Sequence, residues 1–350
     1  MTEPASGPSA ASAPASSDPA DLERELERFR ARMAALEGEL GRIVVGQRDV
    51  VRQVLVAILA GGHALLEGVP GLGKTLLCRS LAQALDMTFR RIQFTPDLMP
   101  ADILGTLVVV EDERGRKTFE FQQGPIFGNL VLADEVNRAT PKTQSALLEA
   151  MQESMVTTAG ERRALPDPFF VLATQNPIEM EGTYPLPEAQ LDRFLLKVDV
   201  TAQGVDELVE ILRRTTGAAV PAPGQTLDAA TLRRFRALVR QVPAAEPVLR
   251  YAATLARATH PDAAEATDKV RRFVQYGASP RGAQALVLAA KATALLAGRA
   301  HVDPDDVAAV ALPALRHRVL LSFEGQAAGA KVDDLLREVL AQVPRGPALR

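Results

Sequence analysis

The chain contains 350 residues, of which 47% are apolar and 24% are charged, and its formal net charge is −3. This apolar content supports packed cores, and the length favours two domains. No long basic block is present, so composition gives nucleic acid no support as a partner. The sequence has no apolar run that could cross a bilayer and no secretory signal, so we expect a cytoplasmic protein without membrane insertion. Its single cysteine, Cys78, excludes an intramolecular disulfide.

The first part of the chain divides into a tail and a helix. Residues 1–20 are mainly Ala, Ser, Pro and Gly, and we expect disorder because little there offsets the entropy of ordering. Residues 21–40 carry apolar side chains at alternating spacings of four and three, which predicts a helix packed against its own domain along a narrow seam. Val45 and Gly46 then follow an apolar stretch and could form a wall for an adenine ring, although similar pairs also precede ordinary helices.

A glycine-rich turn lies between an apolar run at 64–66 and a segment with helical spacing that begins near residue 73. Residues 68–75 read GVPGLGKT. The glycines permit backbone angles that let successive N–H groups converge on phosphate oxygens, and the helix dipole favours an anion there. Lys74 can reach the outer phosphates, and the Thr75 hydroxyl can ligate Mg²⁺. The strand–turn–helix setting indicates a nucleoside triphosphate site rather than a chance turn.

An apolar run at 130–133 ends in two acids, Asp134 and Glu135. Beside a phosphate-binding turn, Asp134 can hold Mg²⁺ directly or through water, and Glu135 can act as general base for the attacking water. The alternative is a strand end with two exposed acids, which is a common surface feature. The glycine-rich turn upstream favours the catalytic interpretation.

Two further polar residues are placed where an ATPase could use them. Asn176 comes just after the apolar run at 169–174 and could orient water beside the γ-phosphate, although Asn before Pro is also common in turns. Arg193 lies between a predicted short helix starting at 188 and an apolar run that ends at 200. An arginine at a domain edge can complete a neighbouring subunit's site and neutralise charge in the transition state.

The pattern as a whole predicts an α/β domain at 21–203 and an all-α lid at 204–350. Five strands are expected, at 64–67, 88–94, 130–135, 169–174 and in the second half of 188–200, with hairpin insertions at 105–123 and 154–165. Beyond residue 204 we expect helices only, with a loop at 217–224. Ser279 and Pro280 would cap one helix and place Arg281 in its first turn. A cation there opposes the helix dipole and suggests an anionic partner, although surface arginines also occur in first turns.

Together these segments resemble the AAA+ ATPases, and more narrowly the MoxR family. The resemblance covers about residues 25–345 and rests on GVPGLGKT, LADEVNRATPKTQSALLEAMQE, ATQNPIEMEGTYPLPEAQLDRFLLKV and GASPRGAQALVLAAKA. It implies Lys74 and Thr75 as Walker A, Asp134 and Glu135 as Walker B, Asn176 as sensor 1, Arg193 as arginine finger and Arg281 as sensor 2. Arg138 is a rival for the interface role.

The resemblance also implies ATP and Mg²⁺ as cofactors and a homo-oligomeric, typically hexameric ring that remodels a protein client. Such proteins often work with a partner that bears a von Willebrand factor A domain. The expected nucleotide contacts are Val45, Gly46, Gly68, Val69, Pro70, Gly71, Leu72, Gly73, Lys74, Thr75, Leu76 and Asp134. Three alternatives stay open: a metal-chelatase ATPase subunit, a nucleic-acid or transcription-related motor, and a non-catalytic scaffold.

Overall fold

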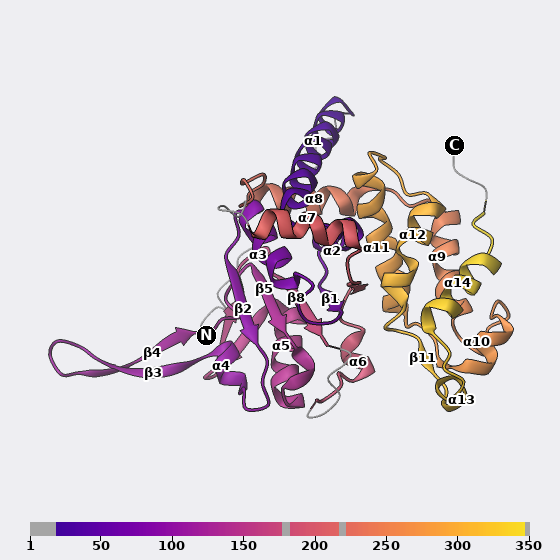
Figure 1. The fold of residues 1–350 in the computed structure, drawn as a ribbon. Coiled ribbons are helices and arrows are strands. Elements are labelled where there is room, and N and C mark those ends of the chain that lie inside the picture. The colour runs from indigo at the N-terminus through magenta and orange to yellow at the C-terminus, as the bar shows by residue number, and fades with distance from the viewer. Residues whose placement is uncertain (1–18, 177–182, 217–221, 347–350) are drawn as a thin grey trace, which may run out of the picture.

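The computed structural model describes residues 19–176, 183–216 and 222–346 (Figure 1). The expected tail at 1–20 lies outside these residues apart from Pro19 and Ala20, which begin the first helix. Most of the loop expected at 217–224 also lies outside them. The described chain has an α/β part followed by a mainly helical part, as the sequence predicts.

A five-stranded parallel sheet forms the centre of the α/β part, in the order β2-β5-β8-β1-β9. All five predicted strands are present. Their apolar residues are buried in long runs because helices cover both faces of such a sheet. The carboxyl ends of parallel strands meet at one edge, where ligands of open α/β sheets bind. The bounds are β1 (Ala64–Glu67), β2 (Phe89–Gln93), β5 (Leu130–Asp134), β8 (Phe170–Gln175) and β9 (Leu196–Asp199).

Seven helical segments belong to the described residues of this part of the chain. The predicted amino-terminal seam is confirmed, because Phe29, Met33, Leu36 and Leu40 are buried in the same core as the sheet. Cys78 is buried as well, and burial raises the pKa of its thiol. The bounds are α1 (Pro19–Ile43), α2 (Arg48–Leu59), α3 (Lys74–Ala84), α4 (Pro100–Leu104), the 3₁₀ helix η1 (Val136–Arg138), α5 (Pro141–Glu153) and α6 (Glu188–Leu191).

Both predicted hairpins are present as antiparallel pairs. One consists of β3 (Gly105–Glu111) and β4 (Lys117–Gln123), and the other of β6 (Met155–Thr158) and β7 (Glu161–Ala164). The β3–β4 hairpin projects far from the body of the molecule (Figure 1). A two-stranded ribbon has no core of its own, so this insertion does not shape the sheet edge where the site lies.

The remaining chain forms eight helices among its described residues, and the expectation of helices only is wrong. Residues 274–276 and 320–321 pair as a small antiparallel sheet, β10 (Val274–Tyr276) with β11 (Leu320–Leu321). Strands this short show no alternation that a sequence pattern could reveal. The helices are α7 (Val205–Thr215), α8 (Ala229–Gln241), α9 (Glu246–Ala258), α10 (Asp268–Phe273), α11 (Pro280–Leu296), α12 (Pro304–Leu315), α13 (Phe323–Ala327) and α14 (Val332–Gln342).

Within the described ranges, every helix is too short or too polar to cross a membrane.

Candidate functional site

The glycine-rich turn lies at the carboxyl edge of the sheet, between β1 and α3. Gly71 (φ +85°) and Gly73 (φ +78°) adopt left-handed backbone conformations that other residues rarely adopt. At Gly68, a Cβ atom would lie 2.5 Å from the carbonyl oxygen of Val200, so the chain after β9 packs directly against the turn. Glycine is therefore required at these positions by backbone geometry, and the turn leads into the open N–H groups of the first turn of α3.

Lys74 is the first residue of α3 and folds back over the turn. Its Nζ donates a hydrogen bond to the carbonyl oxygen of Gly68. Burial lowers the pKa of the half-buried ammonium group, while the nearby carboxylates of Asp134, Glu135 and Glu67 act in the opposite direction. A cation surrounded by acids at a helix start is placed to bind a polyphosphate and to balance its charge.

Asp134 ends β5 beside the turn and is held by two partners. The Thr174 hydroxyl donates to Asp134 Oδ1 at 2.6 Å, and Arg91 Nη2 donates to Oδ2 at 2.6 Å. The same Thr174 oxygen accepts the backbone N–H of Glu135 at 2.8 Å. Thr174 is buried on the neighbouring strand β8, so one hydroxyl orients both acids.

Glu135 has left-handed backbone angles (φ +57°), which are uncommon for a non-glycine residue and cluster at functional sites. Its carboxylate accepts hydrogen bonds from Gln93 Nε2 at 2.8 Å and from Arg138 Nη1 at 3.0 Å. Arg138 therefore lies beside the acid of its own chain. Arg91 and Gln93 were not predicted from the sequence, although their i, i+2 spacing places both polar side chains on one face of edge strand β2.

The turn and the strand ends enclose a cavity of about 400 Å³. Asn176, buried just after β8, reaches this cavity together with both acids, as the sequence predicts. Seven of the ten lining residues are polar or charged, which suits a polyphosphate. The lining residues are Pro70, Gly71, Gly73, Lys74, Thr75, Arg91, Asp134, Glu135, Thr174 and Asn176.

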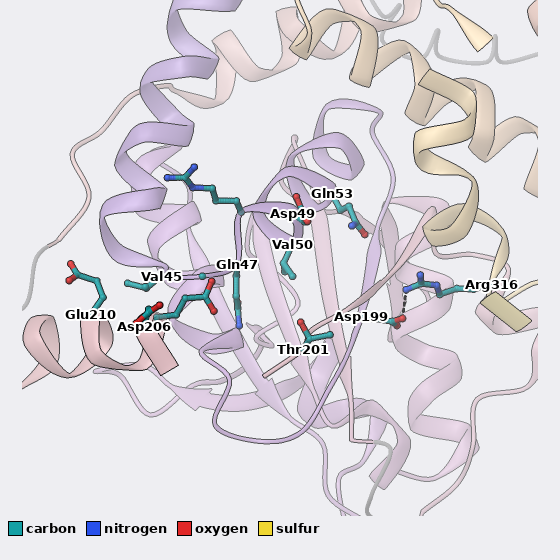
Figure 2. A pocket seen from close by; sticks show the side chains of 13 residues that line it. Val45, Gln47, Asp49, Val50, Gln53, Asp199, Thr201, Asp206, Glu210 and Arg316 are labelled. Carbon is teal, nitrogen blue, oxygen red and sulfur yellow. Dashed lines mark ion pairs between the residues drawn. The ribbon is translucent and has the colours of Figure 1, made fainter. Parts of the chain in front are cut away.

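A second cavity of about 830 Å³ is lined by Val45 and Gly46, the predicted adenine wall (Figure 2). Gln47 connects the two cavities, because its side chain lines the larger one while its Nε2 donates to the Leu72 carbonyl oxygen in the turn at 2.8 Å. The oxygen of that amide, Oε1, is buried and has no hydrogen-bond partner among the described residues. The larger cavity can hold a nucleoside whose phosphates extend into the smaller one.

Four of the predicted nucleotide contacts, Gly68, Val69, Leu72 and Leu76, line neither cavity. The carbonyl oxygen of Leu72 accepts the hydrogen bond from Gln47. The role of all four residues in nucleotide binding remains a prediction.

The donors in the smaller cavity fit Mg²⁺. Thr75 and Asp134 both line it and offer one hydroxyl and one carboxylate. Within the described residues, no group of three or more His, Cys, Asp or Glu side chains is arranged to hold a metal ion. Mg²⁺ keeps several waters and binds one or two protein oxygens together with substrate phosphates, so the Thr75 hydroxyl and the Asp134 carboxylate match the ligands that it takes from a protein.

Arg193 and Arg281 lie away from this cavity, at the end of the sheet where the parallel strands begin. Both line a third cavity with Gly62 and His63, which precede β1, whereas the phosphate-binding turn follows β1. A four-residue strand spans about 13 Å. The Nη1 of Arg193 donates to the Leu148 carbonyl oxygen near the end of α5 at 2.7 Å. The structure thus brings the two arginines together and separates them from the cavity that contains the acids of the same chain.

The two arginines are fixed beside each other by a polar junction between α6 and α11. Asp192 accepts hydrogen bonds from Ser279 Oγ at 2.9 Å and from Arg318 Nε at 2.7 Å. Arg318 also donates to the carbonyl oxygens of Asp192 and Phe194. Asp192 adjoins Arg193 and Ser279 precedes Arg281 by two residues, so this junction sets the distance between them. No sequence pattern pointed to it.

His63 also contributes to this edge. It is partly buried, and this burial lowers its pKa to about 4. Its Nδ1 accepts the N–H of Val171 at 3.0 Å, so Nε2 carries the proton and donates to the Met151 carbonyl oxygen at 3.0 Å. The neutral ring ties β1 and β8 to the end of α5.

Models of known protein families match the α/β part and the helical part of the chain separately. A model of the ATPase family associated with various cellular activities (AAA) matches residues 63–196, and a model of the AAA lid domain matches residues 266–339. The first match contains the turn, both acids, Asn176 and Arg193. The second contains Arg281.

Whole-chain relatives are similar over most of their length. YeaC of Bacillus subtilis is 44% identical over 312 residues, which cover 87% of this chain and 92% of YeaC. Chaperone MoxR1 of Mycobacterium tuberculosis is 42% identical over 305 residues, which cover 87% of this chain and 80% of MoxR1. A crystal structure of a Cytophaga hutchinsonii protein aligns with a TM-score of 0.87 and 39% identity, covering 95% of this chain and 99% of that one.

Proposed function

This chain belongs to the MoxR family of AAA+ ATPases, and from that premise we propose that it hydrolyses ATP with Mg²⁺ at sites completed by a second copy of the chain. One observation supports the proposal above all. The phosphate-binding turn and both acids line one cavity, whereas Arg193 and Arg281 line another at the opposite edge of the sheet. A single chain therefore cannot place these arginines on its own nucleotide.

The residues of the cavity have distinct roles in this mechanism. Backbone N–H groups of the turn and Lys74 bind the β- and γ-phosphates, and Thr75 and Asp134 hold Mg²⁺, which neutralises phosphate charge when bound. Glu135 accepts a proton from the attacking water, and Asn176 orients that water. In the larger cavity, Gln47 Oε1 is a buried acceptor that suits the amino group of adenine.

The arginines reach the nucleotide of the next copy. Arg193, supplied across the interface, stabilises the charge that develops on the transferred phosphoryl group, and Arg281 binds the same nucleotide from the adjoining helix. Two different faces of the chain meet in such a contact, so repetition of it closes a ring. A hexamer is the arrangement we propose.

Turnover in the ring is proposed to remodel a partner protein. The relative in Mycobacterium tuberculosis carries the name chaperone, and the division into a nucleotide core and a lid lets hydrolysis change their relative position. A protein with a von Willebrand factor A domain is the proposed partner. Capture of bound proteins by the ATP-loaded Glu135→Gln variant, compared with the same variant without nucleotide, identifies the client.

The central experiment uses Arg193→Ala. Loss of an arginine finger lowers kcat by about 10³-fold or more, while the distance from the chain's own phosphate cavity leaves ATP binding intact. Phosphate release and titration with a fluorescent ATP analogue measure the two quantities. Unchanged hydrolysis in an assembled ring would remove Arg193 from the mechanism.

Mixing two inactive variants tests action between chains. Glu135→Gln lacks the general base but keeps its arginine, whereas Arg193→Ala keeps the base and lacks the arginine. In mixed rings, the Arg193→Ala chain receives the missing group from its neighbour, so activity should return. No recovery at any mixing ratio, despite mixed assembly, would contradict completion by a second copy.

A further inference from the structure

Helix α7 exposes its apolar face to solvent, which is unusual for a helix of a globular protein. Val205, Leu208, Val209 and Leu212 recur at i, i+3, i+4 and i+7 and form one stripe. These side chains are 77%, 46%, 40% and 58% exposed, and none of the helix residues is buried. Surface helices of globular proteins turn such a stripe toward the core. Here the apolar stripe faces away from the rest of the chain.

The opposite face of α7 is polar and faces the body of the molecule. Arg214 donates to the carbonyl oxygens of Gly41 and Arg42 after the seam of α1, and it pairs with Glu210 at 2.6 Å. A Cβ atom on Gly46 would lie only 2.5 Å from the carboxyl carbon of Glu207, so this side chain packs directly against the Gly46 backbone. These contacts keep the helix from rotating, so its apolar stripe stays outward.

The attached face of α7 forms one wall of the larger cavity. Asp206, Glu207 and Glu210 line it together with Val45 and Gly46 (Figure 2). The outward stripe consequently lies at the rim of the nucleotide site. In Figure 1, α7 crosses the upper part of the molecule, whereas α13 lies at the lower right.

We infer that the apolar stripe of α7 is covered by the next copy of this chain when it completes the nucleotide site, which rests on the function proposed above. The arginines of that copy must approach this same site, so its surface must pass the rim where the stripe is exposed. The arginine-bearing part also offers apolar surface. Tyr276, five residues before Arg281, is 61% exposed, and Phe323 is 87% exposed beside the same small sheet.

The contact is heterologous, because the stripe and the Tyr276–Phe323 surface are different parts of the molecule. The position of α7 between the cavity and the neighbouring copy has a further consequence. One helix touches the nucleotide cavity with its polar face and the neighbouring copy with its apolar face. Docking of the neighbour and occupancy of the cavity therefore act on the same element.

The first test replaces both exposed leucines in the full-length chain, as Leu208→Glu/Leu212→Glu. Assembly measured by light scattering should fall to monomer, and turnover should fall about 10³-fold because the neighbour's arginine is lost. Affinity for a fluorescent ATP analogue should change less than about twofold, which also shows that the chain is folded. The matched control is Leu249→Glu on α9, where the leucine is 40% exposed, and it should assemble normally.

Full assembly and turnover of the double variant would overturn the inference. Loss of client capture alone, with normal rings, would do so too, and would assign the stripe to a client protein instead. If Arg193→Ala remains active, the proposed function itself fails. An inactive Arg193→Ala beside a fully active double variant rejects only the role of α7.

The second test mixes the double variant with Arg193→Ala. The Arg193→Ala chain supplies an intact stripe and an intact nucleotide site, and the double variant supplies the arginine, so one competent interface forms and activity returns. Mixing the double variant with Glu135→Gln should restore nothing, because the only intact stripe then adjoins a site without its base. Equal recovery in both mixtures, or in neither, would contradict the inference.

Discussion

Arg318 and Asp192, which are 126 residues apart in the chain, form an ion pair with 2.7 Å between Nε and Oδ1. The side chain of Arg318 is only 3% exposed. Burial lowers its pKa, and the carboxylate of Asp192 opposes that effect. This pair joins the end of α12 to the segment that carries Arg193. It therefore connects the lid to the part of the core that carries Arg193.

Replacing Arg318 by Met should lower both stability and turnover. Removing one partner of a buried ion pair costs about 3–5 kcal/mol, because the other charge is left buried and unpaired. Urea unfolding measures that loss. Arg337→Met is the control, since Arg337 pairs with Asp334 on the surface and such pairs contribute about 0–1 kcal/mol. Equal losses of unfolding free energy in the two variants would show that the buried ion pair contributes no more to stability than the surface pair.

Thr174 can be tested as the residue that positions the two acids. Thr174→Val keeps the shape but removes the hydroxyl, leaving the Glu135 N–H without its acceptor, which costs about 1–3 kcal/mol. We expect kcat to fall while the affinity for ATP is little changed, because the phosphate-binding turn is untouched. Thr174→Ser should restore kcat. A serine variant as slow as the valine variant would argue for a packing role.

Gln47 should help to distinguish adenine from guanine. Gln47→Leu removes the buried acceptor Oε1, and we expect ATP binding to weaken about tenfold, as for one lost hydrogen bond to a desolvated group. GTP has a carbonyl oxygen where ATP has its amino group, so GTP binding should weaken less. Competition titrations of both nucleotides give the ratio. An equal loss for both would leave Gln47 with only its structural bond to Leu72.

Stability should decline as the pH falls from about 6.5 toward 4. The folded pKa of His63 is lowered to about 4 by burial, whereas an exposed histidine titrates near 6.5. Between these values the unfolded chain binds more protons, so acid favours unfolding. For His63 alone the loss is about 2 kcal/mol at pH 5. His63→Gln should flatten the dependence of the unfolding free energy on pH, and an unchanged slope would contradict this.

The local parts of the site could be predicted from the sequence, whereas parts assembled by the fold could not. The glycine-rich turn and the acids after β5 are each encoded within a few consecutive residues. Arg91 and Thr174 reach Asp134 only through the pairing of β5 with β2 and β8, and sequence spacing does not give strand order. The edge at which Arg193 lies depends on the same order.

The orientation of α7 could not be predicted from the sequence for a different reason. Its periodicity marks a helix with one apolar face, and pattern alone would turn that face inward. Arg214 and Glu207 reverse this by binding the segment at 41–46, which lies far away in sequence. A periodic pattern specifies a stripe but not what covers it.

Helix α5 has a consequence for communication around a ring. It follows Glu135 after the short turn of η1, and near its far end the carbonyl oxygens of Leu148 and Met151 are held by Arg193 and His63. Thirteen residues of helix extend about 20 Å, which exceeds the roughly 13 Å that a four-residue strand of the sheet spans. In the proposed ring, α5 would transmit a shift at Glu135 to Arg193, the residue that we propose completes the adjacent nucleotide site. Helix α5 would thus provide a mechanical connection by which one hydrolysis event in the ring sets the timing of the next.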